Sequence, residues 1–295
     1  MRISTSMLYN NLLTGINNQQ NVQDKANTKI ASGKRFLTPA ESGLDYKVSL
    51  DLRHSQTGVQ SSIDAIGTVE SRLNISQTLL NSMSNIIKRA EVLAVQQSSA
   101  QMSNAERQSA LQEATHLTDQ LLSDSNQQWQ GQSLFAGTAV DQTSFVDDGT
   151  GTGTIKYNGS AQDSVVSVSS NQTVVSNIRG DNPAFSAAFN AMRDFKAALS
   201  NNDQVAIQTA LGALNSAGNG MIDLTADTGA RLKAIQISKT SFEDMKLSLD
   251  KQLNTHEGVD IPALVSEFQQ STIALKAAYS QISQIKSLSL VNFLR

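Results

Sequence analysis

Apolar positions near the start of the chain recur every three or four residues from Met7 to Ile30. This spacing predicts an amphipathic helix with a weak heptad seam. The seam consists of Leu8, Leu12, Gly15, Gln19, Val22, Ala26 and Lys29, with Ile16 and Ile30 beside it. The helix is expected to end at Ser32 and Gly33, because glycine commonly ends helices, and Pro39 lies in the following loop.

A second and longer apolar stripe starts near Ala40 and reaches about Gln97. Its positions are Val48, Leu52, Val59, Ile63, Ile66, Leu73, Leu80, Ile87 and Ala90. At 1.5 Å per residue such a helix is about 75 Å long, which indicates a rod. A third helix, with Asn104 as its predicted N-cap, is expected to fold back on the second before Trp129.

The pattern changes after Gly137. Residues 147–153 (DDGTGTG) are typical of turns, residues 155–157 alternate as in a strand, and Asn158-Gly159 predicts a hairpin turn. Valine-rich residues 165–168 and 174–175 predict further strands. Because about 40 residues of sheet are near the lower limit for independent stability, this β insert is expected to rest on the helices.

Helical spacing returns after residues 181–183 (Asp-Asn-Pro), a predicted cap with proline in the first turn. Asn202 or Asp203 is expected to cap the next long helix. Gly258 interrupts it, and residues 260–262 (Asp-Ile-Pro) start a last helix that continues to the end.

The predicted fold is mainly α: an elongated rod of long antiparallel helices, in which the N- and C-terminal segments form a coiled coil. We expect a terminal coiled-coil domain at 1–40 and 259–295. A helical rod domain is expected at 41–138 and 181–258, with a small β domain at 139–180.

Composition supports thin helical bundles rather than a thick core, because aromatic residues make up 5% and hydrophobic residues 39% of the chain. Its 23 basic and 26 acidic residues are interspersed, so no basic face is predicted for nucleic acid. Cysteine is absent, which excludes disulfides and thiolate chemistry. No apolar leader or membrane-spanning run is recognisable, and composition alone would indicate a cytoplasmic protein.

The sequence predicts no catalytic, cofactor or metal site. Residues 32–34 (Ser-Gly-Lys) superficially resemble a phosphate loop, but Thr28 stands where that motif needs glycine. The glycines of 149–153 lack the strand and helix of a dinucleotide loop. The histidines have no second ligand at metal-binding spacing and are expected to be exposed: His54, His116 and His256.

The terminal stripes predict an assembly interface. About 1.5–3 kcal/mol per buried side chain is small beside the cost of ordering two helices, so the isolated pair looks marginal. We expect the ends to be disordered in the free subunit and helical once neighbours surround them. The predicted interface residues are Leu8, Leu12, Ile16, Val22, Ile30, Leu264, Phe268, Leu275, Ile282, Ile285, Leu288, Leu290, Phe293 and Leu294.

Several motifs resemble the bacterial flagellin-like family. Residues 29–35 (KIASGKR) are similar to the signature that ends its first helix. Residues 88–96 and 104–107 resemble its helical hairpin, and residues 287–294 (SLSLVNFL) its C-terminal end. Within the family, residues 1–7, residues 131–137 (GQSLFAG) and the small β insert resemble hook–filament junction proteins more than flagellins.

This resemblance implies a structural subunit that leaves the cell through the flagellar type III export channel without a cleaved signal. It implies as partners hook-associated protein 1, flagellin, further copies of the chain and an export chaperone on the C-terminal helix, with an extracellular location. A short flagellin that forms the filament is the alternative. A coiled-coil binding module or secreted adhesin, with the β insert as recognition surface, is a third possibility.

Overall fold

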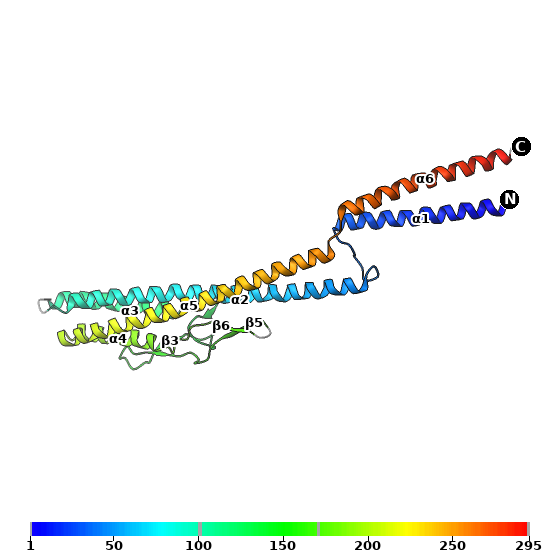
Figure 1. Cartoon of the computed structure of the whole chain (residues 1–295). Helices are drawn as coiled ribbons and strands as arrows, with labels where there is room; N and C mark the ends of the chain where they lie inside the picture. The colour runs from blue at the N-terminus through cyan, green and yellow to red at the C-terminus, as the bar shows by residue number, and fades with distance from the viewer. Residues whose placement is uncertain (1, 100–101, 170–171, 294–295) are drawn as a thin grey trace. The chain divides into compact units, whose positions relative to one another are not determined.

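The computed structural model describes residues 2–99, 102–169 and 172–293, and it is 73% helical (Figure 1). Its helices are α1 (Arg2–Ser32), α2 (Gly43–Gln97), α3 (Asn104–Ser125), α4 (Pro183–Ser200), α5 (Gln204–Glu257) and α6 (Ile261–Phe293). Its strands are β1 (Gln128–Trp129), β2 (Gln132–Ser133), β3 (Phe145–Asp147), β4 (Ile155–Tyr157), β5 (Val165–Ser169) and β6 (Gln172–Val175). The mainly α fold with a small β insert is therefore confirmed.

The contacts divide the chain into two compact units. Unit 1 comprises residues 1–57 and 246–295, and unit 2 comprises residues 58–245. The division falls inside α2 and α5, whereas the predicted domain boundaries follow the helix breaks.

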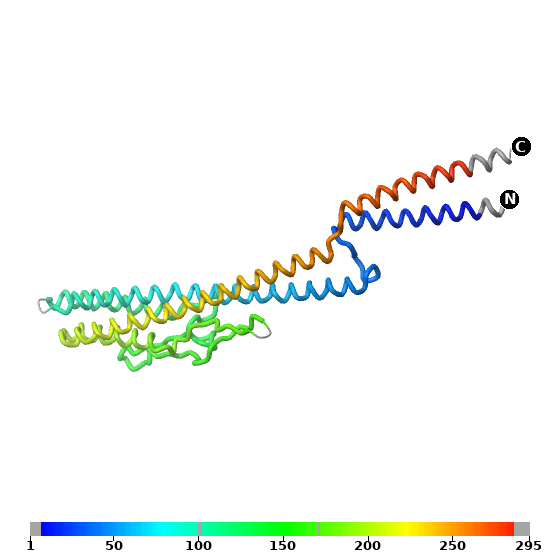
Figure 2. Tube along the Cα trace, in the orientation of Figure 1, coloured from blue at the N-terminus to red at the C-terminus, as the bar shows by residue number. Residues whose placement is uncertain are grey.

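Unit 1 contains α1 and α6, which lie side by side in antiparallel orientation (Figure 2). Hydrogen bonds pair Gln20 with Tyr279 and Gln23 with Thr272, so residue numbers rise on one helix as they fall on the other. Gly33 ends α1 with φ 68°, and its N–H donates to the carbonyl of Lys29. The predicted helix stop and the pairing of the two chain ends are confirmed.

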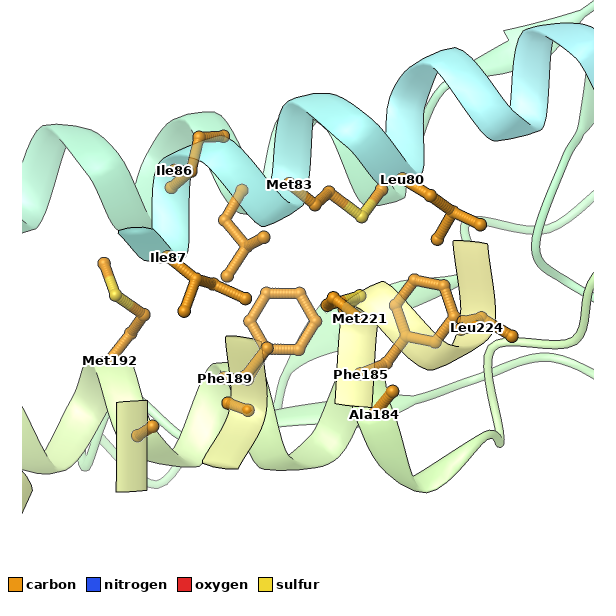
Figure 3. Packing of buried hydrophobic residues seen from close by; sticks show 14 of the residues in the cluster. Leu80, Met83, Ile86, Ile87, Ala184, Phe185, Phe189, Met192, Met221 and Leu224 are labelled. Atoms are coloured by element: carbon orange, nitrogen blue, oxygen red, sulfur yellow. The ribbon is translucent and has the colours of Figure 1, made fainter. Parts of the chain in front are cut away.

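The core of unit 2 lies between α2, α4 and α5 (Figure 3). The side chains from the three helices that meet in the close-up include Leu80, Met83, Ile87, Phe185, Phe189, Met192, Met221 and Leu224. α3 folds back on α2 as predicted, because Arg89 bonds Glu113 while Ser82 bonds Asp124. Among the described helices, none combines the length and apolar character needed to span a bilayer.

Helix caps explain where the helices begin. Asn182 caps α4 and Pro183 is its first residue, as predicted. Of the two candidates for α5, Asp203 accepts hydrogen bonds from the first-turn backbone N–H groups. The predicted Asn104 cap of α3 was wrong: Ser103 is the cap and forms a capping box with Glu106, so Asn104 is already helical.

The strands form antiparallel pairs rather than one sheet: β1 with β2 just before the β insert, and β3 with β4 and β5 with β6 within it. The predicted hairpin turn at Asn158-Gly159 was wrong, since β4 pairs with the preceding β3 and not with β5. The cause is non-local. Asn158 N–H donates to the carbonyl of Ser144, and Ser160 N–H donates to the carbonyl of Ala136, which hold this segment against earlier parts of the insert.

The insert rests on the helices, as expected from its small size. The Phe145 ring lies 5.2 Å from the rings of both Phe185 and Phe189. Val168 and Ile178 of the insert are buried in the same core. The strand pairs thus share the hydrophobic core of the helices instead of forming their own.

Three glycines make the close packing of the insert possible. A Cβ on Gly137 would lie 2.0 Å from the carbonyl oxygen of Ser160, and one on Gly159 would lie 2.4 Å from the Tyr157 hydroxyl. A Cβ on Gly180 would lie 2.6 Å from the Tyr157 ring. We call Gly137, Gly159 and Gly180 the glycine neck; it allows the entering segment to approach Ser160, and the segments at Gly159 and Gly180 to approach Tyr157.

The Gly180→Ala variant is expected to lower the free energy of unfolding by about 1–3 kcal/mol, because its methyl group would overlap buried aromatic rings. Gly67→Ala is the matched control: it lies in α2 with no atom near the added Cβ and should stabilise the chain by about 0.5–1 kcal/mol. Urea unfolding of the full chain measures both, and an equal effect of the two variants would contradict the role of the glycine neck.

Candidate assembly surface and helix joint

The contact line between α1 and α6 is unusually polar. Besides the Gln20–Tyr279 and Gln23–Thr272 bonds, Ser271 Oγ donates to the carbonyl of Gln19, and Ser271 is 1% exposed. Hydrogen bonds of this kind fix the register of two helices but contribute only about 0.5–1.5 kcal/mol each. These bonds therefore define the alignment of α1 with α6 but contribute little to the stability of the pair.

Several large apolar side chains of the same helix pair are exposed to solvent. Exposure reaches 65% for Met7 of α1 and 67% for Ile273 of α6. The exposed large apolar side chains of the two helices are Met7, Leu8, Leu13, Ile261, Val265, Ile273 and Tyr279, of which Tyr279 also accepts the hydrogen bond of Gln20. Exposed apolar side chains of this kind would gain stability if another chain covered them.

The predicted interface residues divide into three groups. Buried between the helices are Ile16, Leu264 and Leu275. Half-buried are Leu12, Val22, Ile30, Phe268, Ile282 and Ile285. Leu8 is exposed; the side chains of Leu288, Leu290 and Phe293, and all of Leu294, lie outside the described part.

The structure thus brings much of the predicted stripe together within one chain, and its role in assembly stays a prediction. The sequence pattern did not point to most of the exposed apolar side chains of the two helices, including Met7, Leu13 and Ile273. The signal that could have found them is the pair Ile261 and Val265, which are four residues apart and outside the predicted seam.

A compact joint connects the helix ends of unit 1. Lys34 and Gly258 form an antiparallel bridge. Arg35 N–H donates to the Glu257 carbonyl at 2.7 Å, and Val259 N–H donates to the Gly33 carbonyl at 3.2 Å. This short ladder joins the loop after α1 to the break between α5 and α6.

The carboxylate of Glu257 lies inside the joint with its side chain 8% exposed. Arg53 of α2 donates to both carboxylate oxygens, at 2.7 and 2.6 Å, and Lys34 Nζ lies 3.4 Å away. Burial alone would raise the pKa of Glu257, but the hydrogen bonds and charge of Arg53 and the charge of Lys34 outweigh it. The pKa of Glu257 therefore lies below its ordinary value.

His256 lies on the other side of the joint. Its side chain is 24% exposed, its Nε2 is 3.0 Å from the Asp45 carbonyl, and its ring meets Phe36 edge-on at 5.8 Å. Arg35 stands over the Phe36 ring at 5.7 Å. The expectation of an exposed His256 was wrong, because loop residues fold over it.

Sequence reasoning did not find this joint, because Lys34, Arg53 and Glu257 are brought together only by the fold. Because its charged groups are paired with one another, the joint can hold the helix ends in position. Among the described residues, no three acidic or histidine side chains gather as metal ligands.

Glu257→Gln is expected to weaken the joint by about 1–3 kcal/mol, since it leaves Arg53 and Lys34 without their anion. The measurement is hydrogen-exchange protection of the Arg35 and Val259 amides, which donate across the joint. The control variant Glu113→Gln instead removes the exposed ion pair between Arg89 and Glu113. It should change the protection of amides near that pair by less than about 0.5 kcal/mol. Unchanged protection in Glu257→Gln would refute the proposed role of the carboxylate.

The contribution of Glu257 should depend on pH. Because its folded-state pKa is depressed below 4.5, its stabilising effect is complete above that value and is lost as the pH falls through the folded-state pKa. The difference in amide protection between the native chain and Glu257→Gln should stay constant from about pH 7 to 5 and vanish in more acidic solution. A difference that persists after full protonation would show that charge is not its cause.

Known proteins resemble this chain in sequence and in fold. Residues 3–140 match the family model described as the bacterial flagellin N-terminal helical region. Flagellar hook-associated protein 3 of Escherichia coli (strain K12) is 23% identical over 317 residues, and the alignment covers 98% of each chain.

Solved structures show the same fold. A flagellar hook-associated protein from Vibrio parahaemolyticus has a TM-score of 0.68 and 18% identity, covering 74% of this chain and 100% of that one. FlgL from Bacillus cereus has a TM-score of 0.61 and 20% identity, covering 69% of this chain and 99% of that one. The chain thus contains a match to the bacterial flagellin N-terminal helical region and is similar along nearly its whole length to flagellar hook-associated protein 3.

Proposed function

We propose that the chain is a structural subunit of the bacterial flagellum that forms the junction between hook and filament. It enters the assembly through α1 and α6. The observation that carries the proposal is the pairing of the two chain ends: hydrogen bonds align α1 with α6, while large apolar side chains of both helices remain exposed.

The energetics favour assembly over an isolated pair. Covering each outward apolar side chain contributes about 1.5–3 kcal/mol, more than a polar contact within the pair. Ile273 and Met7, each about two-thirds exposed, have the most to gain. Neighbouring chains would thus stabilise the helices more than the helices stabilise each other.

The partners that fit this role are hook-associated protein 1 on one side, flagellin on the other, and further copies of the chain within the junction. An export chaperone would hold the C-terminal helix α6 before assembly, and so would cover the apolar side chains of that helix. The subunit would reach its extracellular position through the flagellar type III export channel without a cleaved signal. These proposals rest on family resemblance together with the exposed surface.

The subunit is proposed to be non-enzymatic, in keeping with relatives that are named as flagellar components. A short flagellin is not favoured, because both relatives that align over 98% of the chain are named hook-associated protein 3. An adhesin that uses the β insert would not need its terminal helices, so variants of these helices distinguish the two functions.

Ile273→Asp should abolish swimming and release unassembled subunit into the medium, because it places a charge on the outer face of α6. Ile237→Asp is the matched control: Ile237 is 62% exposed, against 67% for Ile273, but lies on α5 in unit 2. Motility assays and immunoblots of culture medium measure both.

Helix content of the purified Ile273→Asp chain should match that of the native chain, which separates lost assembly from lost folding. Removal of the residues after Leu288 should have the same effect on motility. Normal swimming of both the Ile273→Asp and the truncated strains would overturn the proposed function.

A further inference from the structure

The chain contains two Asn-Gly pairs in very different surroundings: Asn158-Gly159 directly after β4, and Asn219-Gly220 inside α5. A glycine after asparagine leaves the backbone nitrogen open to the neighbouring side-chain amide. We propose that Asn158 is a site of spontaneous deamidation in the folded chain, whereas Asn219 is protected.

The reaction needs only water. The backbone nitrogen of Gly159 loses its proton and bonds to the side-chain carbonyl carbon of Asn158, and the Nδ2 group leaves as ammonia. Water then opens the five-membered imide at either carbonyl, giving aspartate or, with the backbone passing through the side-chain carbon, isoaspartate. The sum is one water taken up and one ammonia released.

The surroundings of Asn158 leave these groups available. Its side chain is exposed, and Nδ2 reaches the Thr143 carbonyl only at 3.5 Å, the outer limit of a hydrogen bond. Among the described residues, no acceptor is found for the N–H of Gly159, although both flanking N–H groups, of Asn158 and Ser160, are bonded. The attacking nitrogen is therefore free while its neighbours are fixed.

Asn219 differs in the features that matter. Gly220 lies in the interior of α5, where its N–H belongs to the helical hydrogen-bond ladder, and a Cβ added to it would lie 3.6 Å from the Cβ of Ala184 in α4. Asn219 Nδ2 donates to Asn215 Oδ1 at 3.3 Å. Imide formation there would require local opening of the helix, which lowers the rate by the equilibrium constant of that opening.

The product at Asn158 would affect the glycine neck. Isoaspartate adds one methylene to the backbone between β4 and Ser160, where Tyr157 Oη donates to the Ser160 carbonyl at 2.8 Å and Ser160 N–H donates to Ala136. Since Gly159 already lacks room for a Cβ, the longer backbone cannot keep these contacts. Modification should therefore loosen the insert at its attachment.

The test is incubation of the full chain in ¹⁸O-labelled water at mildly alkaline pH, followed by peptide mapping by mass spectrometry. Label should appear at position 158 at least about tenfold faster than at position 219. Asn158→Gln should remove the fast signal, and Asn219→Gln should leave it unchanged. Equal labelling at both positions, or none at 158, would overturn the proposal.

A second measurement separates charge from backbone length. Asn158→Asp carries the new charge on a normal backbone and should resist proteolysis at residues 148–154 as well as the native chain does. The fraction containing isoaspartate should be cleaved there faster. If both forms resist equally, the proposed loosening is wrong, even where labelling confirms the site.

Discussion

A buried carboxylate is the interaction on which the terminal unit depends. Glu257 ends α5, and its anion needs both Arg53 of α2 and Lys34 of the loop after α1, because an isolated charge at that depth would be costly. Its backbone carbonyl also receives the N–H of Arg35. One residue therefore fixes the start of α2, the end of α5 and the segments that lead to α1 and α6.

Between α1 and α6, polar and apolar side chains contribute in different ways. The polar contacts between α1 and α6, such as that of Ser271 with Gln19, specify alignment. Apolar side chains such as Ile16 and Leu275 are buried along the pair, while others, such as Ile273, remain exposed. Covering the exposed side chains would stabilise the pair and so favour the proposed assembly. Unit 2 is the opposite case, because its large side chains converge on one shared core.

Local signals predicted the helices well. Glycine at position 33, the Asn182-Pro183 start and Asp203 each act within one helical turn, so their effects can be read from neighbouring residues. The errors came from competition between close alternatives, as for Ser103 and Asn104, or from distant partners. Asn158-Gly159 has the composition of a hairpin turn, yet bonds to Ser144 and Ala136 decide its conformation.

The surface and the joint could be predicted only in part. Helical spacing placed Ile16 and Leu275 on the apolar stripes of their helices. Spacing alone does not say which side of each helix a partner helix covers. The joint could not be predicted from the sequence, because no periodicity relates Lys34 to Glu257.

The pairing of α1 with α6 also has a consequence for the order of folding. Gln20 and Tyr279 are 259 positions apart in sequence, so α1 has no intramolecular partner until nearly the whole chain is available. Closing so long a loop is slow compared with the local contacts that build unit 2. As the chain is made from its N-terminus, its first helix must therefore wait for its last, and the proposed assembly surface is completed only at the end.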